Sequence, residues 1–129
     1  MTSIEAAGLW AGFNALLLIY LSARVGLNRT RLKINLGDGA NPDMSRAIRA
    51  QANYTEYAPA ALLGLVLLAL LGAPAWVIHA LGSVFLFARI AHFLGLGLGV
   101  WPIGRMIGTL FTMLTLLATG LGLIWLAAF

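Results

Sequence analysis

The chain has 129 residues, of which 61% are hydrophobic and only 9% are charged. Soluble globular domains carry about 25% charged residues, so this composition excludes an ordinary water-soluble domain and predicts an integral membrane protein. The absence of cysteine excludes a disulfide framework, a thiolate metal site and a cysteine nucleophile. The formal net charge is +4, and most of the cationic residues fall within residues 24–49. This clustering indicates membrane topology and requires no nucleic acid partner.

Uncharged segments along the chain predict four membrane-spanning helices. Residues 6–23 carry no charge, and neither do residues 57–88, which Gly72-Ala73-Pro74 interrupts. A spanning helix needs about 20 residues, so residues 57–88 belong to two helices joined by a tight turn. Residues 106–129 supply the fourth span. We expect one domain over residues 1–129, an all-α four-helix membrane bundle with helices at about 6–24, 46–71, 75–94 and 104–127.

The expected loop at about residues 25–45 sets the orientation of the bundle. With the residues that flank it, this loop carries six Lys or Arg side chains against two Asp side chains, and no Lys or Arg precedes the first helix. Cationic residues accumulate in cytoplasmic loops, so this loop is expected in the cytoplasm and both termini on the opposite side. In a bacterium, the membrane concerned is the cytoplasmic (inner) membrane.

Polar side chains follow one face of the second predicted helix. Arg46, Arg49, Asn53 and Glu56 are spaced by three, four and three residues, which places them on one helical face that Tyr57 extends. Charged groups deep in a bilayer cost at least about 2.5–3.5 kcal/mol, so they normally face protein or a water-filled cavity. Two interpretations follow. One is an ion pair between Arg49 and Glu56 that joins helices.

The other interpretation is a site for a small polar ligand. In this site Arg49 holds a carboxylate, Glu56 holds an ammonium group, and Asn53 and Gln51 bind peptide groups. A ligand with both carboxylates and amines would satisfy the whole helical face.

Cationic residues also mark the inner ends of the other helices. Arg24 ends the first helix, Arg89 and His92 share a face of the third, and Arg105 opens the fourth. Taken singly, each is typical of an interfacial residue whose long side chain extends to the headgroups. Together they favour an anionic ligand that enters from the cytoplasm. The two histidines and four acids have no metal-ligand spacing, so no metal is expected.

The second predicted helix also carries a recognisable motif. Residues 49–59 read Arg-Ala-Gln-x-Asn-x-x-Glu-Tyr-x-Pro, which resembles the family of membrane-associated proteins in eicosanoid and glutathione metabolism, known as MAPEG. Ser22-Ala23-Arg24, Phe87-Ala88-Arg89 and Arg105 match further family positions, and Gly37-Asp38-Gly39 is similar to the bacterial branch. The resemblance covers residues 22–112 and implies a homotrimer that binds glutathione between subunits near the cytoplasmic side.

The resemblance also implies roles for individual residues. Arg105 is expected near the glutathione sulfur, where a guanidinium favours the thiolate of a thiol that otherwise titrates near about 8.5. The residues expected to contact glutathione are Arg24, Arg49, Gln51, Asn53, Glu56 and Tyr57, with Arg46, Arg89 and His92 as further candidates. The implied activity is a membrane-bound glutathione transferase that acts on lipophilic electrophiles drawn from the lipid, with glutathione peroxidase activity on lipid hydroperoxides as a related reaction.

Two other function classes remain open at this point. A non-catalytic lipid-binding or scaffold protein would have the same fold without conjugating glutathione, although the complete polar motif argues against it. A small four-helix transporter is expected to hold an isolated ionisable residue near the bilayer midplane. Glu56 instead lies beside arginines near the inner end, which disfavours the transporter.

Overall fold

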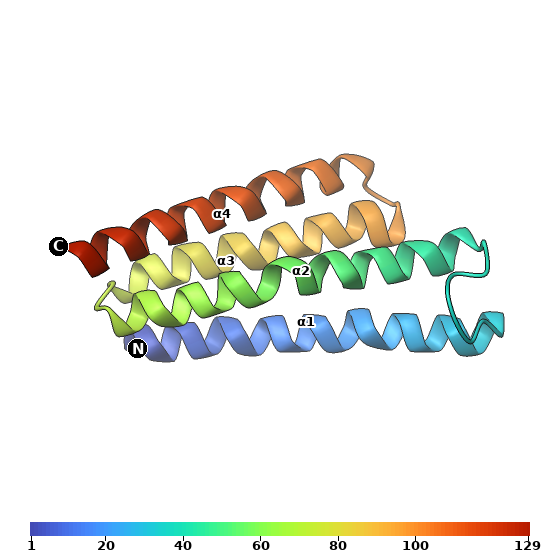
Figure 1. The fold of residues 1–129 in the computed structure, drawn as a ribbon, viewed down its shortest axis with the longest axis horizontal. Coiled ribbons are helices and arrows are strands. Elements are labelled where there is room, and N and C mark those ends of the chain that lie inside the picture. Colours follow the sequence, from blue (N-terminus) through green and yellow to red (C-terminus); the bar gives the residue numbers. More distant parts are fainter.

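Four long helices lie side by side in the computed structural model, which describes residues 1–129 (Figure 1). All four helices are long and apolar enough to cross a membrane, and the structure contains no strand. The elements in chain order are α1 (Ser3–Leu32), α2 (Pro42–Leu70), α3 (Ala75–His92), the π-helix η1 (Phe93–Leu98) and α4 (Pro102–Ala128). The predicted all-α membrane bundle is confirmed.

The helices form two hairpins. α1 and α2 make the first and α3 and α4 the second, so that both termini lie at one end of the bundle (Figure 1). The connection over residues 33–41 lies at the other end, where α1 and α2 extend beyond α3 and α4 (Figure 1). We call this the basic end, because α1 closes there with Arg29 and Arg31 in its last turn. α2 and α4 both begin at the basic end.

The expected loop at residues 25–45 is wrong in its extent. α1 continues to Leu32, well past residue 24, and α2 already begins at Pro42. At about 1.5 Å per residue the 30 residues of α1 span about 45 Å, more than the roughly 30 Å hydrocarbon core. The last turns of α1 therefore run through the headgroup layer, where charge is tolerated. The first cationic residue after the uncharged run, Arg24, therefore does not mark the end of this helix.

Side-chain hydrogen bonds fix both sides of the shortened loop. Arg29 Nη1 donates to the carbonyl oxygen of Gly37 at 3.0 Å, and Lys33 ends α1 in the left-handed conformation. On the other side, Asn41 Oδ1 accepts the backbone N–H groups of Asp43 and Met44 at 3.0 and 3.1 Å. The Asn41 bonds satisfy backbone N–H groups that the start of α2 leaves unpaired, and the Arg29 bond holds the loop against the last turns of α1.

A buried amide links α1 and α2 in the apolar core. Asn14 is fully buried, and its backbone and side-chain oxygens both accept from the Tyr54 hydroxyl, at 2.9 and 3.1 Å. Asn14 Nδ2 donates to the carbonyl oxygen of Trp10 at 2.9 Å. Because an unpaired polar group is costly inside a bilayer, these bonds fix the register of the two helices.

Small residues let α4 approach the third span closely. A Cβ at Gly95 of η1 would overlap the backbone nitrogen of Arg105, and a Cβ at Gly108 would meet the Ala88 carbonyl and His92. Glycine at these two positions therefore admits the start of α4 against η1 and the end of α3. Arg105 lies at this contact.

The predicted topology can be tested with single cysteines, because the chain has none of its own. Lys33→Cys lies in the basic connection, so we expect a membrane-impermeant maleimide to label it only from the cytoplasmic side. Phe129→Cys, at the opposite end of the bundle, should be labelled only from the other side. Labelling of the two variants from reversed sides would contradict the orientation.

Candidate functional site

The guanidinium of Arg89 joins three helices beneath the basic end. Arg89 is only 2% exposed, although the sequence suggested that it extends to the headgroups, and for this residue that expectation is wrong. Its Nη1 donates to Thr112 Oγ1 on α4 at 3.2 Å, and its Nη2 donates to Asn53 Oδ1 on α2. The Arg89 side chain, which comes from α3, thus bonds to both α2 and α4.

Aromatic faces complete the surroundings of this cation. The Arg89 guanidinium carbon lies 5.9 Å from the ring centroids of both Tyr54 and Tyr57. Such cation–π contacts offset part of the cost of desolvating a positive charge. The Nε atom of Arg89 is buried without a hydrogen-bond partner. The hydrogen-bond partners of Arg89 in the structure are therefore the neutral side chains of Thr112 and Asn53.

A groove at the basic end brings together predicted site residues that are distant in sequence. It has a volume of about 440 Å³ and lies between α2, η1 and α4. We call it the α2–α4 groove; its lining residues are Pro42, Ser45, Arg46, Arg49, Gly95, Leu96, Pro102 and Arg105. Three arginines and no acid line it, so the groove attracts an anion. Arg49 and Arg105, predicted for binding and for thiol activation, share this groove.

The remaining predicted residues of α2 face several directions. Gln51 Nε2 donates to Ser22 Oγ on α1 at 3.0 Å, whereas Asn53 and Tyr57 contact Arg89 of α3. Glu56 is exposed on the surface of α2. The structure therefore groups Asn53 and Tyr57 around Arg89, beneath the α2–α4 groove, and leaves Gln51 directed at α1.

Arg24 lies in a second polar groove at the same end. This α1–α2 groove has a volume of about 460 Å³ and is lined by Arg24, Asn28, Arg31, Asp43, Arg46, Gly97, Leu98 and Gly99. Arg46 lines both grooves. The Arg24 guanidinium lies 5.4 Å from the ring centroid of Phe93. His92 lines neither groove, because it is 3% exposed and packs against Gly108.

Comparison with known proteins decides the family. The model of the MAPEG family matches residues 7–125. The chain belongs to the MAPEG family. The resemblance found in residues 49–59 is thereby confirmed, and this MAPEG protein is a multi-pass integral membrane protein.

Two relatives support the assignment. This MAPEG protein is 34% identical over 89 residues to "Inner membrane protein YecN" of Escherichia coli (strain K12), and the alignment covers 69% of this chain and 68% of the relative. The same figures hold for "Inner membrane protein YecN" of Escherichia coli O6:H1.

Several polar residues near the site were not among the predicted site residues. Asn14 and Thr112 are fully buried hydrogen-bond partners, and Asn28 and Arg31 line the α1–α2 groove. A lone Asn in the uncharged run of residues 6–23 was an available signal for Asn14, since a polar side chain at that depth needs a partner. Thr112 carried a weaker signal, because it also fits a small-residue packing face.

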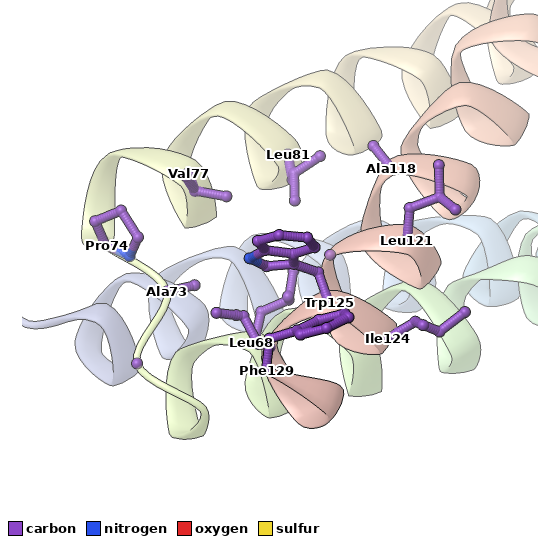
Figure 2. A pocket seen from close by; sticks show the side chains of 13 residues that line it. Leu68, Ala73, Pro74, Val77, Leu81, Ala118, Leu121, Ile124, Trp125 and Phe129 are labelled. Atoms are coloured by element: carbon purple, nitrogen blue, oxygen red, sulfur yellow. The ribbon is translucent and has the colours of Figure 1, made fainter.

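The end of the MAPEG bundle opposite the grooves holds an apolar pocket (Figure 2). Its volume is about 660 Å³, and α2, α3 and α4 supply its walls. The labelled side chains around it are almost all aliphatic or aromatic, with Trp125 at the centre of the view (Figure 2). This pocket lies far from the arginines and supplies no charged group, so the candidate chemistry belongs to the basic end.

Thr112 offers a direct test of the Arg89 contacts. In Thr112→Val the Nη1 group of Arg89 loses its acceptor while the side-chain shape is kept, so we expect a loss of about 1–3 kcal/mol in unfolding free energy. Denaturant unfolding in detergent measures this change. Thr109→Val is the matched control, because Thr109 is exposed and its hydroxyl donates only to the Arg105 carbonyl of its own helix. Equal effects of both substitutions would contradict the role given to Arg89.

Proposed function

We propose that this MAPEG protein is a membrane-bound glutathione transferase that ionises the glutathione thiol and conjugates it to lipophilic electrophiles. The observation that carries the proposal is the convergence of Arg49 on α2 and Arg105 on α4 in the α2–α4 groove. Membership of a family that includes glutathione transferases supports the same reading.

The charges of the groove match those of glutathione. This tripeptide carries two carboxylates, one ammonium group and a thiol. Arg49 and Arg46 would bind carboxylates, for which the guanidinium fork is well suited, and Glu56 on the neighbouring surface would bind the ammonium group. Asn53 has its oxygen bonded to Arg89, so its amide N–H groups are oriented away from that cation and remain for a peptide carbonyl.

Arg105 would act on the sulfur. A guanidinium next to a thiol favours the thiolate, which is the nucleophilic form. The thiolate sulfur then forms a bond to the electrophilic carbon, and the leaving group departs with the electron pair of the bond that breaks. In the related peroxidase reaction the thiolate sulfur would bond to the terminal oxygen of a lipid hydroperoxide, the O–O bond would break, and the lipid alcohol would leave after taking a proton. A second glutathione would then attack the resulting sulfenic acid, which gives glutathione disulfide and water. The lipophilic electrophile and the lipid hydroperoxide would both reach the protein from the bilayer.

The proposal includes assembly as a homotrimer that completes the site. Arg49, Glu56 and Arg105 are all exposed in the single chain, so a ligand bound there would remain half open to its surroundings. Gly8 and Gly12 lie on an exposed face of α1, where a Cβ added to either glycine would have no other atom within 4 Å. Small residues of this kind let helices of adjacent subunits approach closely. A neighbouring chain would enclose the ligand.

One observation favours a second candidate function. The Asn53 oxygen and the faces of two tyrosine rings are already engaged by Arg89, which leaves fewer groups for a ligand. A non-catalytic lipid-binding or scaffold protein would need no more than this structural use of the motif.

The two candidates separate on the behaviour of Arg105. On mixing wild-type protein with glutathione we expect a thiolate absorbance, and Arg105→Ala should abolish it and lower turnover by about 100-fold or more while calorimetry still detects binding. Arg49→Ala should instead lose binding. Lys33→Ala, which removes an exposed cation outside both grooves, is the control and should behave as wild type.

The scaffold function would be favoured by an absence of any glutathione signal in the wild-type protein. A thiolate that persists in Arg105→Ala would refute the role of Arg105 alone, and another cation of the groove would then have to ionise the thiol.

A further inference from the structure

Two of the four methionines of the chain lie on one outward face of α4, next to Arg105. Met106 and Met113 are seven residues apart, which is about two helical turns, and they are 66% and 39% exposed. Both line a groove of about 520 Å³, which we call the α4 groove; its lining residues are Pro102, Arg105, Met106, Thr109, Leu110 and Met113. This face therefore presents two oxidisable sulfur atoms to the membrane.

The other two methionines have different surroundings. Met44 lies near the start of α2 and is fully buried. Met1 is 73% exposed at the N-terminus, at the end of the bundle opposite the basic end (Figure 1). The chain thus carries one protected methionine and one exposed methionine far from Arg105, and both serve as internal references.

The α4 groove continues from the α2–α4 groove into the membrane. Pro102 and Arg105 line both grooves, and Arg105 is the only charged residue of the α4 groove. Beyond Arg105 the groove follows α4 past Leu110 and Met113, away from the basic end. A lipophilic substrate that comes from the bilayer to a thiolate at Arg105 passes along this face. The proposed trimer has to leave the face open for the same reason.

Met106 lies near the edge of the hydrocarbon core. It precedes Ala128, the last residue of α4, by 22 residues, which is about 33 Å along the helix against a core of about 30 Å. A hydroperoxide group on a lipid chain is polar, and polar groups are costly in the hydrocarbon interior. The hydroperoxide group is therefore drawn to the depth at which Met106 lies.

We propose that Met106 is a site of oxidation by lipid hydroperoxides that enter the α4 groove when no glutathione thiolate is present at Arg105. The thioether sulfur bonds to the terminal oxygen of the hydroperoxide, the O–O bond breaks, and the proton of the terminal oxygen passes to the departing alkoxide. Sulfur loses two electrons and the hydroperoxide gains them. The products are methionine sulfoxide and the lipid alcohol, so no further reactant is needed.

The sulfoxide changes the surroundings of Arg105. Its oxygen is a polar acceptor, whereas a thioether accepts hydrogen bonds only weakly. Arg105 can only donate and lines the same groove as Met106, so the new oxygen competes with a glutathione thiolate for the guanidinium. Oxidation of Met106 therefore lowers the ionisation of bound glutathione, and reduction of the sulfoxide restores it. This consequence rests on the proposed function, but the oxidation step itself needs no glutathione.

The first test treats the full-length protein in neutral detergent, without glutathione, with methyl linoleate hydroperoxide. Mass spectrometry of peptides measures the sulfoxide at each methionine. We expect Met106 to be oxidised at least about fivefold faster than Met1, although both are exposed, and Met44 to stay reduced because it is buried. Hydrogen peroxide, which needs no groove, should oxidise Met1 and Met106 at similar rates.

The second test follows the glutathione thiolate signal after the hydroperoxide has been removed. The treated wild-type protein should lose most of the signal, and methionine sulfoxide reductase should restore it. Met106→Leu should keep the signal, since leucine preserves the apolar volume without an oxidisable sulfur. Met113→Leu is the matched control from the same groove, and it should lose the signal as the wild type does.

Three results would overturn the proposal. These are oxidation of Met1 by the lipid hydroperoxide as fast as that of Met106, oxidation of Met113 before Met106, or equal loss of the thiolate signal in Met106→Leu and the wild type. A thiolate signal without any sulfoxide at Met106 would refute this proposal alone. Sulfoxide at Met106 in a protein that never shows a thiolate would refute the transferase and leave Met106 as an oxidation site.

Discussion

A buried guanidinium in an apolar helix bundle must find its partners within the protein, because lipid offers none. Arg89 finds them on α2 and α4, in the Asn53 amide and the Thr112 hydroxyl. Arg49 lies one helical turn before Asn53, and Arg105 lies two turns before Thr112. Since α2 and α4 both begin at the basic end, bonding to Arg89 sets the register that places Arg49 and Arg105 on the same side of Arg89, where both line one groove. The α2–α4 groove depends on this register.

The π-helix η1 separates the two polar grooves. Gly95 in η1 and Gly99 directly after it leave space that a side chain would fill, so that α4 begins against Gly95 and Arg46 lies against Gly99. π-helical turns are often found at functional sites. The result is a basic end with two openings, one flanked by α4 and the other by α1. We assign a soluble anionic tripeptide to the first opening.

The sequence predicts the membrane bundle well because long uncharged runs have no other explanation. It predicts helix ends poorly, since charge alone does not stop a helix in the headgroup layer, and α1 continues through Arg24 to Leu32. The motif on α2 identifies the family, but it does not show that Asn53 bonds to Arg89 or that Gln51 bonds to Ser22. Such partners depend on packing between helices. For the same reason Arg89 was expected at the membrane surface and is found buried.

The proposed transferase activity depends most on the ionisation of a bound thiol in the α2–α4 groove. The measurement that tests it most directly is a titration of thiolate absorbance against pH for glutathione bound to the wild-type protein in detergent. We expect the pKa of the bound thiol to lie at least about one unit below the ordinary value near 8.5, because Arg105 would stabilise the thiolate. Bound glutathione that titrates at its ordinary value would contradict the account, since the groove would then hold the ligand without activating it.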